Sequence, residues 1–327
     1  MPKALRCHAF GGPETLMYEE IPALKPGAGQ VLVSVKAAAV NFPDTLIIQG
    51  KYQYKPDFPF CPGAEISGVV AEVGAGVNSW SVGDAVFGQM PLPYGGFREE
   101  VVLEAESIFK LPGGMGFDVA AAFGAAYGTA YYALHTRGQL RPGETLLVLG
   151  AAGGVGLAAV ELGKLLGATV IAAASSSQKR ALCLTHGASH VIDYSTKDLR
   201  AEIKRLTGGR GVDVVLDPVG GAYAEAAIRS CTWGGRYLVV GFASGAIPTV
   251  PTNILLLKGA SAVGVFWSGF AHHAPEACRQ QLGELSDWVS RGMLAPRISH
   301  RYPLSRGAEA LKLIAEREAQ GKVILMP

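Results

Sequence analysis

The chain has 327 residues, of which 49% are hydrophobic and 17% are charged. This balance excludes an intrinsically disordered chain, and the length is enough for about two domains with large cores. Lysine plus arginine (29) nearly equal aspartate plus glutamate (27), so no strong field would attract nucleic acid or an anionic membrane, and the expected partners are small molecules or further copies of the chain.

The sequence of residues 1–120 predicts a β-rich region. Two ranges, 29–40 and 64–73, alternate like strands, and clusters of Pro and Gly lie between such segments. A change in composition at 112–118 leads into an alanine-rich helix expected at 119–134.

From about residue 144 to 266, short β-branched runs alternate with longer segments that suit helices. This is the pattern of repeated βαβ units, and nearly continuous apolar runs predict parallel strands covered on both faces. Strands are expected at 145–150, 169–174, 190–193, 213–217, 236–242 and 261–266, and helices at 154–166, 178–186, 197–206 and 222–231. Gly167, Gly187 and Gly208 follow three of these helices, where left-handed caps are needed. The predicted product is an open, doubly wound sheet.

Beyond residue 266 we expect helices at 274–290 and 305–320 and a last strand at 322–325. If the two flanks join in space, the middle of the chain is an insertion. The predicted domains are then 1–120 together with 267–327, and 121–266.

The first strand of the middle domain runs into the turn AAGGVG, residues 151–156, and then into a helix. Such a turn lets the backbone approach a pyrophosphate, while the helix N-terminus offers amide hydrogens. A tight turn that binds no ligand can have the same sequence. The dinucleotide-binding interpretation therefore depends on the position of the motif, which follows the first of six strands. Ala152, Gly153, Gly154 and Val155 are the expected contacts of a dinucleotide.

The second strand is followed by Ser175, Ser176, Lys179 and Arg180, where an NAD-specific protein usually has Asp or Glu. Hydroxyls and cations at this point favour the 2′-phosphate of NADP. The alternative is the capped start of a surface helix. Tyr194, after the third strand, is either a core residue or a contact of the adenosine end.

The five cysteines lie tens of residues apart without a C-x-x-C pair, which favours a reducing compartment over a disulfide framework. Arg6 and His8 interrupt the first ten residues, so no signal peptide is predicted. The apolar run 146–160 is broken by glycines and is too short to cross a bilayer. We therefore expect a cytoplasmic protein that does not enter a membrane.

Several motifs follow one another in a fixed order along the whole chain. They are NFPD at 41–44, GKY at 50–52, PGAEISGVV at 62–70, VGD at 82–84, YGTA at 127–130, PGE at 142–144, GGRGVD at 208–213 and DPVGG at 217–221. With the glycine turn, they make the chain resemble the zinc-free NADPH:quinone oxidoreductase family of the medium-chain dehydrogenase/reductase superfamily. The resemblance implies an α/β fold, with a GroES-like β-rich catalytic domain and a doubly wound parallel Rossmann domain that binds NADPH.

Zinc alcohol dehydrogenases of that superfamily hold a catalytic metal with a Cys at the position of Asn41 and a His at that of Ala64. A neutral amide and a methyl group cannot replace a thiolate and an imidazole as ligands. The four-cysteine structural zinc lobe is missing too, and His272, His273 and Cys278 are more typical of a polar helix than of a metal site. No metal is expected.

By the resemblance, Asn41, Asp44 and Tyr52 line the substrate cleft as the catalytic set. Asn41 would donate to the nicotinamide ribose or carboxamide region, and Tyr52, or its neighbour Tyr54, would bind the acceptor oxygen. A helix-capping role is equally consistent with Asp44. Leu46 stands where some related quinone reductases have a tyrosine, which predicts a more apolar acceptor pocket.

Further cofactor contacts are expected from the resemblance and from the carboxyl ends of parallel strands. Trp267 is either such a contact or a packing residue, and Arg317 either assists the adenosine phosphates or lies on a solvated helix face. The predicted cofactor set is Asn41, Thr129, Ala152, Gly153, Gly154, Val155, Ser175, Ser176, Lys179, Tyr194, Gly241, Phe242, Phe266 and Arg317.

Without a metal, reduction needs an acceptor held close to the nicotinamide and donors where negative charge develops. Quinones and α,β-unsaturated carbonyls suit such a site, whereas aliphatic alcohols do not. The first hypothesis is therefore an NADPH-dependent quinone reductase, with hydride or one-electron transfer left open. The second is an enone, enal or enoyl-thioester double-bond reductase.

A third hypothesis comes from another class, because zinc-free relatives also serve as lens structural proteins or bind AU-rich RNA. Five basic residues between 291 and 306 give little support, since no aromatic residues alternate with them in the manner of single-strand binders. We expect no nucleic-acid partner. The resemblance implies a homodimer or homotetramer through residues 261–268, since relatives often dimerise by extending the sheet across that edge. An open apolar edge would otherwise invite aggregation.

Overall fold

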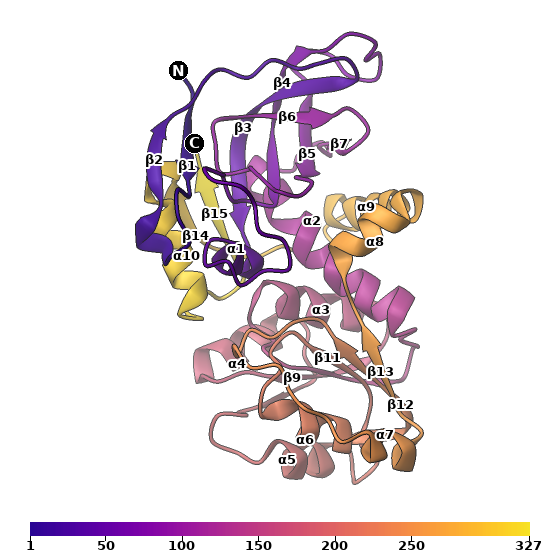
Figure 1. Cartoon of the computed structure of the whole chain (residues 1–327). Helices are drawn as coiled ribbons and strands as arrows, with labels where there is room; N and C mark the ends of the chain where they lie inside the picture. The colour runs from indigo at the N-terminus through magenta and orange to yellow at the C-terminus, as the bar shows by residue number, and fades with distance from the viewer. The chain divides into compact units, whose positions relative to one another are not determined.

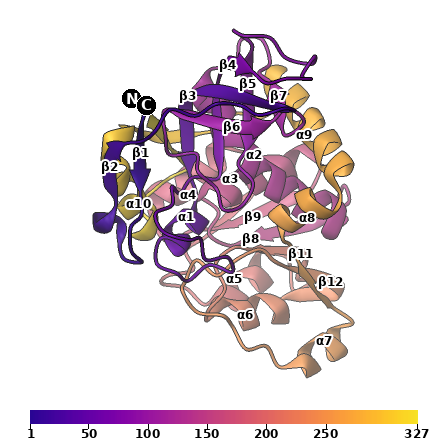
Figure 2. The same ribbon diagram turned by 45° about the horizontal axis from the view of Figure 1, so that its top comes forward.

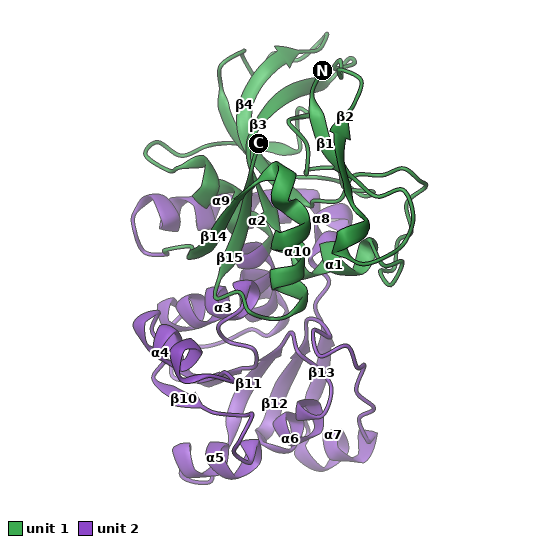
Figure 3. Ribbon diagram, turned by 90° about the vertical axis from the view of Figure 1, so that its left-hand side faces the viewer, with its two compact units in different colours: residues 1–125, 295–327 green, residues 126–294 purple.

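The computed structural model describes all 327 residues. They form two compact units, residues 1–125 with 295–327 (unit 1) and residues 126–294 (unit 2), and the division falls within helix α2 (Phe117–Tyr131) (Figure 3). The domains expected from the sequence place 267–294 with the flanks, and those boundaries stay a prediction. By its contacts this segment groups with the middle of the chain.

Aromatic and polar contacts within unit 2 explain that grouping. Helices α8 (Trp267–His273) and α9 (Pro275–Ser290) pack on the residues just after residue 125. The ring of Tyr132 stacks on Phe270 with centroids 4.2 Å apart, and the hydroxyl of Tyr131 donates to Glu284 at 2.8 Å.

The sheet of unit 2 is entirely parallel, with the strand order β10-β9-β8-β11-β12-β13. Its strands are β8 (Thr145–Val148), β9 (Thr169–Ala173), β10 (His190–Ile192), β11 (Val212–Asp217), β12 (Cys231–Val239) and β13 (Ser261–Gly264). All six predicted strands are confirmed. In chain order the sheet has the 3-2-1-4-5-6 arrangement of doubly wound dinucleotide-binding folds.

Helices cover both faces of this sheet (Figures 1 and 2). Their bounds are α3 (Gly154–Leu165), α4 (Ser177–Thr185), α5 (Leu199–Leu206), α6 (Tyr223–Arg229) and α7 (Thr252–Lys258). Side chains of α5, α6 and α7 share one core with the strands, whereas α3 and α4 lie on the other face. Positive φ angles of 81°, 110° and 59° at Gly167, Gly187 and Gly208 confirm the predicted left-handed caps. Helix α7 was not predicted, because its apolar side chains Leu256 and Leu257 point to solvent.

Unit 1 is built on a mainly antiparallel sheet with the order β14-β15-β3-β4-β5-β7, in which β14 and β15 are parallel and β6 also pairs with β3. Its strands are β3 (Gln30–Val40), β4 (Glu65–Val73), β5 (Ala85–Gln89), β6 (Glu100–Glu104), β7 (Ile108–Lys110), β14 (Ile298–Pro303) and β15 (Lys322–Met326). A hairpin of β1 (Lys3–Arg6) and β2 (Met17–Glu20) completes its β structure. Strand β15 pairs with β3, Val323 opposite Val40, so the C-terminal strand lies beside the start of the NFPD motif.

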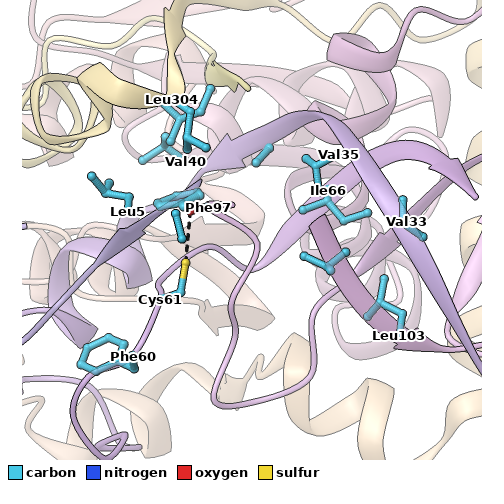
Figure 4. Close-up of a cluster of buried hydrophobic side chains, with 14 of the residues drawn as sticks. Leu5, Val33, Val35, Val40, Phe60, Cys61, Ile66, Phe97, Leu103 and Leu304 are labelled. Atoms are coloured by element: carbon cyan, nitrogen blue, oxygen red, sulfur yellow. Dashed lines mark hydrogen bonds between the residues drawn. The ribbon is translucent and has the colours of Figure 1, made fainter. Parts of the chain in front are cut away.

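Helices α1 (Phe42–Ile47) and α10 (Gly307–Ala315) belong to unit 1, with single helical turns at Pro13–Thr15 and Leu304–Arg306. Helix α10 ends earlier than the predicted residue 320, because Arg317 turns to a left-handed φ of 60°. Figure 4 shows the core of this unit, where Leu5, Val33, Ile66 and Phe97 pack together. None of the helices has the length and hydropathy that crossing a membrane requires.

Candidate active site

The glycine turn between β8 and α3 is closed so tightly that Gly156 has no room for a side chain. A Cβ there would lie 2.3 Å from the carbonyl oxygen of Gly150, which itself has a φ of 57°. Gly153 precedes α3 with an extended backbone and supplies no side-chain cap. The first backbone N–H groups of this 12-residue helix therefore have no side-chain cap and are open to an anion. Ala152, Gly153, Gly154 and Val155 are the predicted contacts of that anion.

The end of β9 presents the predicted serines and one of the two predicted cations. Ser176 caps α4, its Oγ accepting from the backbone N–H of Lys179 at 3.2 Å. Ser175 is exposed, whereas Arg180 is bound to Asp193 at 2.8 Å. Arg180 is therefore held by a carboxylate, and Ser175, Ser176 and Lys179 stay the predicted donors to the cofactor at this strand end.

Tyr194 lies after β10 with its ring edge against Tyr223, the centroids being 4.5 Å apart at 78°. It is half-buried and packs on the core of unit 2. One side of the ring is therefore structural, and a contact of the ring with the adenosine end stays a prediction.

The ends of β11 and β12 are held by a buried carboxylate that sequence reasoning missed. Asp217 is 1% exposed, accepts from the N–H groups of Val219 and Gly220 at 2.7 and 2.8 Å, and accepts from the hydroxyl of Tyr237. Burial, together with this carboxylate, raises the pKa of Tyr237. The available signal was the acid at the end of a buried strand that begins the DPVGG motif, residues 217–221.

This arrangement fixes the loop after β11 against the predicted residues Gly241 and Phe242. A Cβ at Gly220 would lie 2.9 Å from the ring of Phe242, so the loop and the ring fit only in the absence of a side chain. The carboxyl ends of β8, β9, β11 and β12 thus meet at one edge of the sheet, where ligands of this fold bind.

Thr129 and Phe266 are the chain neighbours of Gly128 and Trp267, two residues that pack against each other. Trp267 is 6% exposed, and a Cβ at Gly128 would be 2.5 Å from its ring, so this aromatic residue is a packing residue. Phe266 is 52% exposed, and Thr129 is partly exposed. Both are accessible within unit 2.

In unit 1, Asn41 belongs to a closed ring of hydrogen bonds with Glu65 and Lys322. The ammonium of Lys322 donates to Asn41 Oδ1 at 2.6 Å and to Glu65 Oε1 at 2.5 Å, and Asn41 Nδ2 donates to the same Oε1 at 2.9 Å. The other oxygen of Glu65 accepts from the N–H of Ala125 at 2.7 Å. The side chains of Lys322 and Glu65 are only 5% and 2% exposed, so the amide of Asn41 has one fixed orientation.

Asp44 lies directly beneath this ring at the start of α1. One carboxylate oxygen accepts from the N–H of Asn41 at 2.7 Å and the other from the N–H of Gly63 at 3.2 Å. Burial raises the pKa of Asp44 to about 7, although these two donors and the charge of Lys322 act in the opposite direction. With no exposed surface, Asp44 fits the helix-capping interpretation better than direct contact with a substrate.

Tyr52 is partly exposed and is contacted by a second tyrosine from another loop. The hydroxyl of Tyr94 donates to the hydroxyl of Tyr52 at 3.3 Å. Tyr52 thus accepts one bond and keeps its own proton for another acceptor. Tyr54 points elsewhere, into a pocket described below, which favours Tyr52 of the two candidates. Leu46 in α1 is partly exposed, and Arg317 is exposed beyond the end of α10.

Two protein-family models match the chain. "Alcohol dehydrogenase GroES-like domain" covers residues 27–113, and "Zinc-binding dehydrogenase" covers residues 154–287. Because the name of the second family model refers to zinc, we compared the side chains of the candidate site with the ligands that zinc prefers.

The donor set in unit 1 does not suit a zinc ion. Asn41 and Ala64 provide an amide and a methyl group, and the ammonium of Lys322 occupies the bonding positions of Asn41 and Glu65. A buried cation at this point would repel a second one, and the thiolates and imidazoles that zinc prefers are lacking. The structure also contains no group of three or more His, Cys, Asp or Glu residues that could hold a metal.

The relatives extend over nearly the whole chain. A quinone oxidoreductase-like protein 2 homolog from Nematostella vectensis is 39% identical, with 99% of this chain and 88% of that protein covered. The crystal structure of Escherichia coli quinone oxidoreductase complexed with NADPH is 32% identical with a TM-score of 0.93, covering 99% and 100% of the two chains. A structure titled NAD-dependent alcohol dehydrogenase is 31% identical with a TM-score of 0.91, covering 99% of each. The chain therefore belongs to the quinone oxidoreductase family of the medium-chain dehydrogenase/reductase superfamily.

Proposed function

We propose that this protein is an NADPH-dependent reductase that acts on quinones without a metal. The main support for the cofactor is the glycine turn before helix α3. The N-terminus of α3 has no side-chain cap and Gly156 has no side chain, so a pyrophosphate has space to bind there. Ser175, Ser176 and Lys179 support a 2′-phosphate over the two free ribose hydroxyls of NADH. The NADPH complex of the Escherichia coli relative supports the same choice.

The acceptor is inferred from the chemistry of unit 1. When bound, reduced nicotinamide supplies a hydride, and a quinone accepts it because the resulting hydroquinone anion is stabilised by conjugation. The hydroxyl of Tyr52, itself accepting from Tyr94, has a proton available for the acceptor oxygen. Elsewhere in unit 1, hydrogen bonds to Lys322 and Glu65 hold the amide of Asn41 in one orientation, so the chain positions polar groups without a Lewis acid.

Two measurements test this function. Fluorescence titration should show tighter binding of NADPH than of NADH, and a preference for NADH would contradict the assignment. A panel of quinones and short enones should show faster NADPH oxidation with quinones. The Tyr52→Phe variant should lower kcat/KM for quinones by about tenfold, the usual loss for one hydrogen bond in the transition state, whereas Tyr54→Phe should not. Faster turnover of the enones would instead favour the double-bond reductase.

An RNA-binding role lacks support from the basic residues near the C-terminus. Arg291, Arg301 and Arg306 are bound to Asp287, Asp118 and Glu309, respectively. A paired guanidinium contributes little to a phosphate-binding surface. All five cysteines are free and buried, which agrees with the cytoplasmic location that we propose.

A further inference from the structure

A pocket of about 420 Å³ lies within unit 1, away from the ring of Asn41, Glu65 and Lys322. It is formed by β1, by the segment after β2 and by two loops, and none of the predicted catalytic residues lines it. Its lining is Ala4, Arg6, Ile21, Pro22, Leu24, Tyr54, Pro56, Asp57, Pro59, Phe60, Cys61, Pro93, Tyr94 and Arg98. Two arginines among mainly apolar side chains distinguish it.

The backbone places these two arginines on the same face. Ala4 forms an antiparallel bridge with Arg98, and the N–H of Leu5 donates to the carbonyl of Phe97 at 2.9 Å. Because alternate residues of an extended chain point to one side, Arg6 and Arg98 are diagonal neighbours on the side of Ala4. Like charges in such a pair repel each other, so an anion between them would be stabilised.

Only one of the two charges is balanced within the chain. Arg6 donates to Glu19 at 2.9 Å, and Glu19 also binds His8. Arg98 makes no ion pair: its guanidinium lies beside the buried thiol of Cys61, and its Nε is buried without a hydrogen-bond partner. Asp57 is the sole acid of the lining, is exposed and binds neither arginine. The guanidinium of Arg98 is therefore the cation of this lining that no carboxylate pairs.

The walls determine what kind of anion fits. Phe60, Ile21 and four prolines form a rigid apolar wall, and the volume is that of sites for small organic ligands. A guanidinium binds a planar carboxylate through two parallel hydrogen bonds. We propose that this pocket binds a small monocarboxylate with an aromatic or aliphatic body, its carboxylate on Arg98 and its body against Phe60.

Tyr94 connects the pocket to the proposed acceptor site, and this part of the inference rests on the proposed function. Tyr94 lines the pocket, donates to Tyr52, and has a φ of 76°, a conformation that side-chain-bearing residues rarely adopt. A ligand packed against Tyr94 would displace the hydroxyl that holds Tyr52. Occupancy should therefore change KM for the quinone and leave NADPH binding unchanged.

The binding test uses the purified full chain without cofactor or quinone, so it does not depend on the proposed function. Calorimetric titration with benzoate and octanoate should give saturable binding. The neutral benzamide and inorganic phosphate should bind at least about tenfold more weakly, since each lacks one of the two recognition elements. Arg98→Gln should weaken benzoate binding by about tenfold or more, Arg98→Lys by less, and Arg200→Gln, on the exposed face of α5, not at all.

Three results would overturn the proposal. They are no saturable carboxylate binding at millimolar concentrations, benzoate binding by a folded Arg98→Gln variant equal to that of the original chain, and tighter binding of phosphate than of benzoate. Unchanged NADPH titration establishes that the variants are folded. If the variants change benzoate binding as expected but benzoate does not change KM for the quinone, the carboxylate pocket is supported and the connection through Tyr94 is wrong.

Discussion

The ammonium of Lys322 lies 2.5 Å from Glu65 Oε1, although the two residues are 257 positions apart in the sequence. Both side chains are almost fully buried. Removing one partner of a buried ion pair leaves the other charge uncompensated, which typically costs about 3–5 kcal/mol. We therefore expect Lys322→Met to lower the free energy of unfolding by this amount, measured by urea denaturation.

The control for this change is Lys36→Met, on the exposed face of β3, which should change stability by less than about 0.5 kcal/mol. Adding Glu65→Gln to Lys322→Met removes the orphaned carboxylate and should restore part of the stability. A single variant as stable as the original chain would mean that the ion pair contributes little.

Asp44 makes stability depend on pH with a defined sign. Burial raises its pKa from 3.8 to about 7 in the folded chain, so the folded state retains the proton longer than the unfolded state does. Stability is unaffected below about pH 4, falls as the pH rises towards 7, and changes no further above it, with a slope of at most about 1.4 kcal/mol per pH unit. Chemical denaturation across pH 4 to 8 should therefore show this decline in the original chain, but not in Asp44→Asn.

The exposed Asp57 supplies the comparison for that series. Asp57→Asn should show the same decline between pH 4 and 7 as the original chain, because it leaves the buried carboxylate of Asp44 in place. Parallel curves for Asp44→Asn and the original chain would show that Asp44 titrates at its ordinary value when folded.

Gly156 is the position where the cofactor site tolerates least change. A Cβ would approach Gly150 O to 2.3 Å and the Cα of Ala151 to 2.8 Å, so Gly156→Ala must push the helix from the turn. We expect at least about a tenfold loss in NADPH affinity and a loss of about 1–3 kcal/mol in stability, as for other overpacked sites. Gly283→Ala, in α9 with nothing within 4 Å of the new Cβ, should leave NADPH titration unchanged, and equal effects of the two would refute the steric account.

The sequence predicted the sheet of unit 2 well because its central strands β8 and β11 are fully buried and β9 is nearly so, which makes each of them a nearly continuous apolar run. Among residues 1–120 it predicted only β3 and β4, and it also missed β14. Strands β2 and β14 are mainly or partly exposed, and β1, β5, β6 and β7 have only three to five residues each, which is too short for an alternation to be detected. Asn41 and Asp44 could be singled out from a motif. Lys322 could not, because a lysine at the start of a last strand is indistinguishable from a solvated one until β15 pairs with β3.

Lys179 should distinguish the two nicotinamide cofactors in the proposed site. Its side chain lies in the first turn of α4, after the exposed Ser175, whereas Arg180 is occupied by Asp193. Lys179→Met should weaken NADPH binding by about tenfold, the contribution of one charge-assisted hydrogen bond, and leave NADH binding unchanged. Lys197→Met, whose side chain is 56% exposed, serves as the control in the same fluorescence titrations, and equal losses for both nucleotides would contradict a phosphate contact.

The free edge of the parallel sheet should form a homodimer interface. Strand β13 is paired only with β12, and nearby Trp233, Leu256 and Leu257 are 79%, 78% and 71% exposed, a concentration of apolar surface that a lone chain would expose to aggregation. Light scattering after gel filtration should give twice the chain mass of 34.1 kDa. Leu256→Glu combined with Leu257→Glu should shift the protein towards monomer, because two charges would be buried at the contact. Leu184→Glu, on α4 and 48% exposed, should not change the mass, and a dimer that survives the double change would place the interface elsewhere.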